Sequence, residues 1–210
     1  MNHVRLLSDE ACDSIKPVDN FDFEEYKSQP WFSVRQRETL PEQSIDLGCV
    51  EARYSLEPQR SWHKWLMGWD FSVNNYGSFP DGTVAEVYLC AKIVNPENPS
   101  AVIVGPCFLP SLFFRFGNFR NGNYWVVVYN ETAGYAAVTG GQPSIDVGDG
   151  TCINEEGKGF WFLFRERDPS DELMDMLTTE VEALGINTET LTDMYDVDHS
   201  NCTRPRPDDE

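Results

Sequence analysis

Alternating apolar and polar residues run through the middle of the chain and predict β-strands. In segment 49–56 the apolar side chains fall on every second position, which predicts a strand with one buried face and one solvent-exposed face that carries Glu51. Segment 65–74 alternates more strictly, with large apolar residues on one face and Asp70 on the other. Segment 31–38 alternates as well. We expect three half-buried strands in the first third of the chain.

Further strands are predicted between residues 83 and 165, where turn residues divide short apolar runs. Asp81-Gly82 and Asn121-Gly122 are typical hairpin turns. The strands are expected at 83–94, 101–105, 112–117, 123–129, 134–139 and 159–165. This succession of eight or nine short strands shows no internal repeat and no linker, so it predicts one all-β domain, either a sandwich or a closed barrel without exposed edges.

The hydrophobic period changes to that of a helix after residue 167. Asp168 is the expected N-cap, Pro169 stands at the first helical position, and Gly185 is placed to end the helix. One helical face carries Leu173, Leu177, Val181 and Leu184. We expect one amphipathic helix that packs this stripe on the outside of the β structure.

Charge excludes one large class of function. The 210 residues include 16 basic and 35 acidic side chains, a net charge of −19, so a nucleic-acid partner bound through a basic face is excluded. The longest apolar runs fall far short of the roughly 18 residues that a membrane-spanning helix needs, and we expect a chain that does not span a membrane. The first residues lack the apolar segment of a secretory signal, so the chain is either numbered as a mature protein or never had one.

Six cysteines favour an oxidising compartment. They form no Cys-x-x-Cys pair, and His3, His63 and His199 are scattered, so we expect no metal site. An even number of widely spaced cysteines fits three disulfides, with 15 pairings open, and the alternative is six reduced thiols in the cytosol. Asn130 and Asn201 begin Asn-x-Thr sequons, which matter only on a secretory route.

Two segments resemble the lipocalin family. Residues 20–26 (NFDFEEY) followed by Trp31 resemble the family's first conserved region, and residues 160–165 (FWFLFR) before the helix resemble its third. Segments 49–56, 81–84 and 198–202 resemble the apolipoprotein D-like lipocalins in particular. The similarity runs from about Cys12 to Cys202. A more distant resemblance is to the lipocalin domain of violaxanthin de-epoxidase.

The resemblance implies an eight-stranded antiparallel up-and-down β-barrel with one C-terminal α-helix packed outside. It implies an N-terminal arm (1–18) followed by the barrel with its helix (19–202). The remaining residues, 203–210, are acidic and Pro-rich, and this composition predicts a disordered tail. Trp31 would close the barrel floor, with Arg165 packed across its ring. It also selects among the pairings, implying the disulfides Cys12–Cys152, Cys49–Cys202 and Cys90–Cys107.

A lipocalin barrel has room for one small ligand, and the strand alternation supplies candidate cavity walls. They are Tyr54, Trp65, Met67, Trp69, Phe71, Val87, Leu89, Phe114, Phe116, Trp125 and Tyr135. Such apolar and aromatic walls suit a carotenoid, a tetrapyrrole, a retinoid or a lipid, with no obligatory cofactor. The alternative is that these side chains fill a ligand-free core.

The sequence carries no catalytic motif, so we expect no enzyme. A de-epoxidase or isomerase activity has only the family resemblance behind it, and its candidate acid, Asp70, falls on the outward face of its predicted strand. The other alternative is a structural subunit docked on a protein partner, such as a pigment-protein membrane complex. The expected location is extracellular or in an organelle lumen such as the thylakoid lumen, because the predicted disulfides need oxidising conditions.

Overall fold

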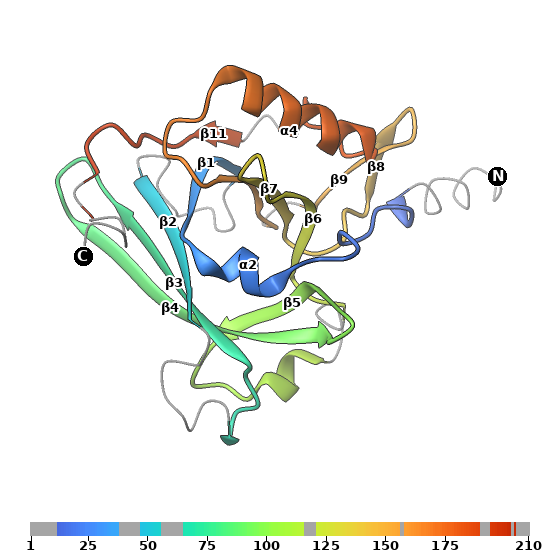
Figure 1. Cartoon of the computed structure of the whole chain (residues 1–210). Helices are drawn as coiled ribbons and strands as arrows, with labels where there is room; N and C mark the ends of the chain where they lie inside the picture. The colour runs from blue at the N-terminus through green and yellow to red at the C-terminus, as the bar shows by residue number, and fades with distance from the viewer. Residues whose placement is uncertain are drawn as a thin grey trace.

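The fold is a closed antiparallel β-barrel in a computed structural model that describes residues 12–37, 47–55, 65–115, 121–155, 158–189, 194–202 and 204 (Figure 1). Each barrel strand pairs with the barrel strands before and after it along the chain, and the last, β10, pairs with β1 to close the barrel. The eight strands are β1 (Trp31–Arg37), β2 (Gly48–Ser55), β3 (Phe71–Ser78), β4 (Val84–Asn95), β5 (Asn98–Pro106), β6 (Tyr124–Asn130), β7 (Tyr135–Thr139) and β10 (Phe160–Phe164). The predicted eight-stranded up-and-down barrel is confirmed.

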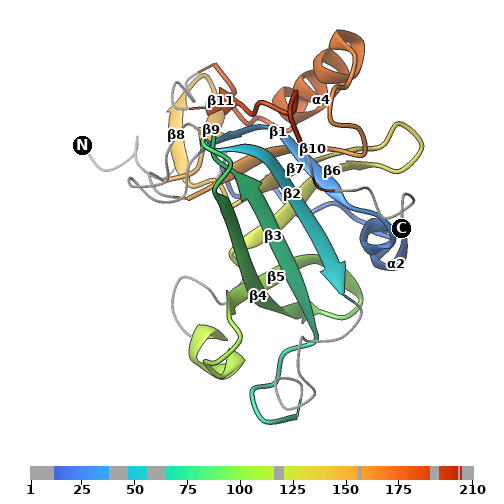
Figure 2. The same ribbon diagram turned by 90° about the vertical axis from the view of Figure 1, so that its left-hand side faces the viewer.

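Three short strands were not predicted from the alternation. β8 (Ile145–Gly148) and β9 (Thr151–Ile153) form a separate hairpin in the segment between β7 and β10 (Figure 2). β11 (Met194–Asp196) pairs with the C-terminal end of β1. Strands of three or four residues are too short for a period of two to stand out in a sequence.

Within the described residues, two α-helices lie against the barrel. The short helix α2 (Phe23–Ser28) begins at Asp22, whose carboxylate accepts a hydrogen bond from the Glu25 amide at 3.0 Å. The predicted C-terminal helix is α4 (Asp171–Ala183), and its N-cap is Ser170 rather than Asp168. Gly185 follows the helix with φ +82°, the left-handed conformation that ends many helices.

Two predicted strand segments have another structure. The strand expected over 65–74 begins only at Phe71, because Gly68 (φ +70°) reverses the chain and residues 65–67 form a turn. Segment 112–117, also expected as a strand, forms the 3-10 helix η1 (Ser111–Arg115), and residues 116–120 lie outside the described part. A hydrogen bond from the Ser111 amide to the Met67 carbonyl, 2.8 Å long, joins the two segments.

Three disulfides tie distant parts of the chain to the barrel. They pair Cys12 with Cys152, Cys49 with Cys202, and Cys90 with Cys107, the pairs that the resemblance implied. The first fixes the N-terminal segment to β9, the second fixes the segment after β11 to β2, and the third fixes the loop after β5 to β4. All six cysteines lie in the described part of the chain and all are paired.

The barrel wall is buried on both faces along β6, β7 and β10. Inside the barrel, Val126, Ala136, Val138 and Leu163 pack around Trp31. On the outside, helix α4 lies across β6 and β7 (Figure 1). Its fully buried Leu177 and Val181 pack in one cluster with the phenylalanines of β10. Cys12 and Ile15, from the expected N-terminal arm, are buried in the same outer cluster.

Candidate functional site

The barrel interior is the candidate site. Residues directly opposite each other in neighbouring strands share a face, so the pairs Phe71–Ala91, Val73–Leu89 and Asn75–Val87 extend one inner face along β3 and β4. On the opposite side of the barrel, β6, β7 and β10 also turn apolar and aromatic side chains towards the lumen. They are Tyr124, Val126, Tyr129, Ala136, Val138, Trp161 and Leu163.

Exposure rises along the inner face of β3 and β4. Phe71 is 3% exposed and Val73 is 5% exposed, whereas Val87, further along the same face, is 52% exposed. The barrel is therefore filled at the Phe71 end and open towards the β3–β4 turn. An open end lined by apolar side chains is the arrangement through which a hydrophobic molecule can enter a barrel.

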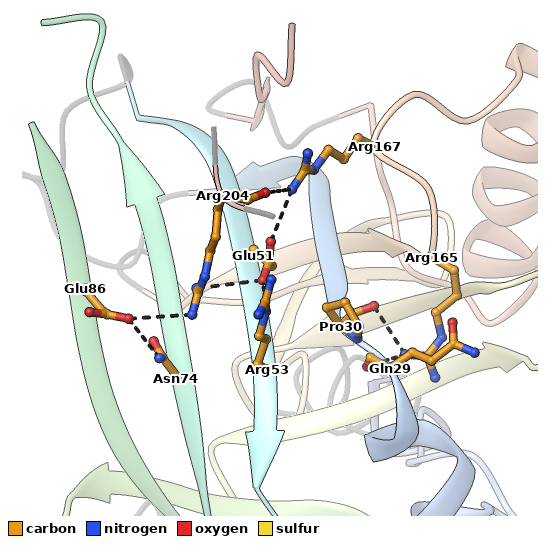
Figure 3. Close-up of polar contacts among 9 residues, drawn as sticks. All are labelled: Gln29, Pro30, Glu51, Arg53, Asn74, Glu86, Arg165, Arg167 and Arg204. Atoms are coloured by element: carbon orange, nitrogen blue, oxygen red, sulfur yellow. Dashed lines mark hydrogen bonds and ion pairs between the residues drawn. The ribbon is translucent and has the colours of Figure 1, made fainter. Parts of the chain in front are cut away.

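The closed end is sealed by Trp31, helix α2 and Arg165. The guanidinium carbon of Arg165 lies 3.7 Å from the ring centroid of the fully buried Trp31, a cation–π contact. Its two terminal nitrogens donate hydrogen bonds to four backbone carbonyls, those of Glu25, Tyr26, Gln29 and Pro30. Figure 3 shows the bonds to Gln29 and Pro30. The Trp31 indole donates to the Tyr26 carbonyl at 2.9 Å, so hydrogen bonds tie both Trp31 and Arg165 to the backbone of residues 25–30.

Three tyrosines meet just inside this floor, and we refer to Tyr26, Tyr54 and Tyr124 as the tyrosine cluster. The Tyr124 hydroxyl lies 2.8 Å from that of Tyr26 and 2.7 Å from that of Tyr54. Burial raises the pKa of all three phenols above the ordinary value of about 10. The hydroxyls therefore stay protonated and neutral at physiological pH, each able to donate one hydrogen bond.

Known structures share this architecture, although sequence comparison finds nothing: no family model and no curated protein matches the chain. Insecticyanin from the tobacco hornworm Manduca sexta is similar with a TM-score of 0.56 at 14% identity, over 89% of this chain and 85% of its own. Apocrustacyanin A1 from lobster gives 0.51 at 14%, over 90% and 83%, and the allergen Per a 4 from cockroaches gives 0.53 at 12%, over 87% and 91%. The chain has the lipocalin fold. Identities this low show the fold alone.

The lipocalin barrel brings four of the predicted cavity residues to its inner face. Tyr54 belongs to the tyrosine cluster, Phe71 packs beside it with ring centroids 6.3 Å apart, and Val87 and Leu89 line the open end. Phe116 lies outside the described residues.

Trp125 and Tyr135 lie on the outer face instead. Trp125 pairs with Thr139, and Tyr135 pairs with Phe164 and donates a hydrogen bond to Glu180 of α4 at 2.7 Å. Because α4 covers β6 and β7, both faces of these strands are apolar, and alternation cannot show which of them points inward.

The predicted cavity residues near Gly68 also lie outside the lumen. Trp69 and Phe114 pack on the outer face of β4 and β5 around Cys90–Cys107, with Met67 beside them, and Trp65 is 83% exposed. Gly68 breaks the alternation for Trp65 and Met67. Trp69 stands before β3, which begins only at Phe71, so the strand alternation does not extend to it.

Sequence reasoning missed the inward position of Tyr124, Tyr129 and Trp161. A bulge between Val126 and Val128 changes the parity of β6, so that both Tyr124 and Tyr129 face the lumen. Tyr26 stands in the segment that resembles the first lipocalin region. Its hydroxyl joins two tyrosines from distant strands, and no local signal marks this contact.

A second polar group lies on the outer face of β2. Glu51, predicted to be solvent-exposed, is 2% exposed, and its carboxylate contacts Arg53, Arg167 (3.5 Å) and Arg204 (3.7 Å) (Figure 3). Arg204 also lies 3.6 Å from Glu86 on β4. Arg204, the one described residue of the tail expected at 203–210, thus lies against the outer face of β2 and β3, where Glu51 binds it.

No metal or membrane feature stands out in the described part of the chain. Its His, Cys, Asp and Glu residues nowhere come together in threes that could hold a metal ion. Within the same residues, no helix is long and apolar enough to cross a membrane.

Proposed function

We propose that this protein binds and carries a small hydrophobic molecule inside its lipocalin barrel. The observation that carries the proposal is the inner face of β3 and β4, which is apolar apart from Asn75 and becomes solvent-exposed at the open end. The likeness in fold to insecticyanin and apocrustacyanin supports it. A carotenoid, a tetrapyrrole, a retinoid or a lipid fits these walls, and no catalytic group is required.

Substitution at the open end tests this proposal. Val87 points inward and Tyr88 points outward on the same strand, and they are exposed to similar extents, 52% and 42%. We expect Val87→Asp to weaken binding about tenfold, because the ligand must strip water from a carboxylate, and Tyr88→Asp to leave binding unchanged. Quenching of tryptophan fluorescence by retinoids, carotenoids, a bilin and fatty acids measures the affinity.

Two outcomes would contradict the proposal. Equal loss of binding in both variants would place the ligand outside the barrel. The proposed ligand binding would also be wrong if none of these ligands quenched the fluorescence of the wild-type protein and no small molecule could be extracted from the protein isolated from its native source.

We further propose a location and a closer relationship for this lipocalin fold. Three disulfides indicate an oxidising environment, and the proposed compartments are the extracellular space and an organelle lumen. Segments 49–56, 81–84 and 198–202 support closeness to the apolipoprotein D-like lipocalins.

A patch on the outside favours a second function, that of a subunit docked on a membrane protein complex. Five large apolar side chains, each at least 58% exposed, project there from the segment before β3 and the loop of η1. They are Trp65, Leu66, Phe108, Leu112 and Phe113. Segment 106–114 contains no charged residue in this acidic chain, and exposed apolar patches of this kind mark interaction sites.

Phe113→Glu tests the docked state. We expect the wild-type protein to comigrate with a pigment-protein membrane complex in a density gradient of mildly solubilised native membranes, and Phe113→Glu to remain at the top of the gradient. Val84→Glu is the control, because Val84 is also exposed but stands at the start of β4, away from the patch. Comigration of Phe113→Glu with the complex would overturn this second function.

A further inference from the structure

We infer that Cys49–Cys202 is a redox-active disulfide, in which Cys202 exchanges with an external dithiol and His199 is its acid–base partner. This reactivity is separate from ligand binding in the barrel. Three features of the molecule support it: the accessibility of the disulfides, the contacts of His199 and the backbone conformation of Cys49.

The three disulfides differ in accessibility. The four cysteines of the other two disulfides are at most 7% exposed, and Cys49 is 8% exposed. Cys202, in contrast, is partly exposed, and it is the only one of the six cysteines that is not buried. Because an attacking thiolate must reach a sulfur atom for exchange to occur, Cys202 is the cysteine that an external dithiol reaches first.

His199 places a basic nitrogen beside the sulfur of Cys202. Its Nδ1 lies 3.7 Å from the Cys202 Sγ, and its Nε2 lies 2.9 Å from the Ser33 carbonyl oxygen. Since a carbonyl oxygen only accepts hydrogen bonds, Nε2 carries the proton of the neutral ring, and Nδ1 presents its lone pair to the sulfur. The imidazole packs edge-on against Phe32, with ring centroids 6.0 Å apart, which helps to hold it in this orientation.

The surroundings of His199 favour the neutral ring. Burial lowers the pKa of His199 below its ordinary value of 6.5, and the nearby Arg167 lowers it as well. The hydrogen bond to Ser33 and the carboxylates of Asp198 and Glu51 act in the opposite direction. A neutral imidazole can take a proton from a thiol, and the imidazolium that forms stabilises a neighbouring thiolate.

The backbone of Cys49 has a conformation that residues other than glycine rarely adopt. Its φ of +51° lies in the left-handed region. The Cys49 amide donates a hydrogen bond to the Asp198 carbonyl at 2.8 Å, so this bond and the disulfide both hold Cys49 against the segment after β11. Strained residues of this kind cluster at functional sites and switch regions, and cleavage of the S–S bond removes one of these restraints.

Reduction proceeds in two exchange steps. A thiolate of the dithiol attacks the Cys202 Sγ, the S–S bond breaks, and Cys49 leaves as a thiolate that takes a proton from water. His199 Nδ1 then accepts the proton of the second thiol, whose sulfur attacks the first sulfur of the dithiol and closes the disulfide of the reductant. Cys202 leaves as a thiolate paired with the imidazolium. The protein gains two electrons and two protons, and the dithiol loses them.

Partial reduction of the folded protein tests the order in which the disulfides react. The protein is incubated with dithiothreitol without denaturant, free thiols are trapped with N-ethylmaleimide at successive times, and peptide mass spectrometry locates the label. We expect Cys49 and Cys202 to be labelled at least about tenfold faster than the other four cysteines, because exchange rates depend on access to the sulfur. Equal or earlier labelling of either other disulfide would overturn the inference.

His199→Gln tests the acid–base role, because glutamine retains an amide donor for the Ser33 carbonyl and has no basic nitrogen. In the reduced protein, the rate at which iodoacetamide alkylates Cys202, measured against pH, reports the pKa of this thiol. We expect a pKa below the usual value of about 8.5 in the wild-type protein, and alkylation at pH 7 about tenfold slower in His199→Gln. Arg204→Gln is the matched control, since Arg204 holds the same segment on Glu51, and it should leave the pH profile unchanged.

The two variants separate the chemistry of His199 from a loosening of the C-terminal segment. An unchanged pH profile in His199→Gln, or the same shift in both variants, would overturn the acid–base role. A Cys202 thiol that titrates at or above the usual value in the wild-type protein would overturn it as well. None of these measurements involves a ligand, so their failure would leave the proposed binding function standing.

Discussion

Replacing Cys49 and Cys202 together by alanine is expected to lower the free energy of unfolding by about 4–5 kcal/mol. The disulfide closes a segment of 153 residues, and the entropy that a cross-link removes from the unfolded chain grows with this length. Its loss also frees the segment that holds Arg204 against Glu51 and Glu86. Guanidinium denaturation without reductant, followed by tryptophan fluorescence, measures the change.

The shorter disulfide is the control for this prediction. Cys90–Cys107 closes only 17 positions, so its removal should cost about 3 kcal/mol. A loss from the Cys49–Cys202 pair equal to or smaller than the loss from the Cys90–Cys107 pair would show that the long cross-link and the contacts of Arg204 contribute less than the fold indicates.

Trp31→Ala is expected to lower the free energy of unfolding by about 4 kcal/mol. The ring is fully buried in the barrel floor, its indole donates to the Tyr26 carbonyl, and Arg165 packs on its face. Deleting so large a buried side chain typically costs about 3–5 kcal/mol. Thermal and denaturant unfolding of the purified variant measure the loss.

Trp65→Ala makes the same chemical change at an exposed position. Trp65 is on the surface, and an exposed substitution of this kind should change stability by about 0.5 kcal/mol or less. Similar losses in the two variants would mean that the floor packing around Trp31 is not the source of its effect.

Local sequence patterns were sufficient to predict most strands and the single long helix. Alternation is visible wherever a strand has one apolar face, as in β2 and β3, and the amphipathic stripe ending at Gly185 indicates α4. The resemblance to lipocalins at residues 20–31 and 160–165 added the closed barrel, which agrees with the fold of the structure.

The candidate site was predicted less completely. Tyr54, Phe71, Val87 and Leu89 were placed on the inner face, where the structure has them. Trp125 and Tyr135 were predicted to point inward and point outward, and Trp69 was predicted inside although it precedes β3 and packs outside. A bulge and a chain reversal change which way a side chain points, and neither is visible in a pattern of apolar and polar residues.

Short strands and one amphipathic helix are predictable for this chain without its fold, because these elements depend on local periodicity. The lumen-facing side of each strand, the burial of Glu51 among arginines and the hydrogen bonds of Tyr124 with Tyr26 and Tyr54 depend on the closed barrel. These contacts join residues 70 to 153 positions apart (124 − 54 and 204 − 51). They exist because barrel closure brings distant strands together, and local periodicity carries no information about such contacts.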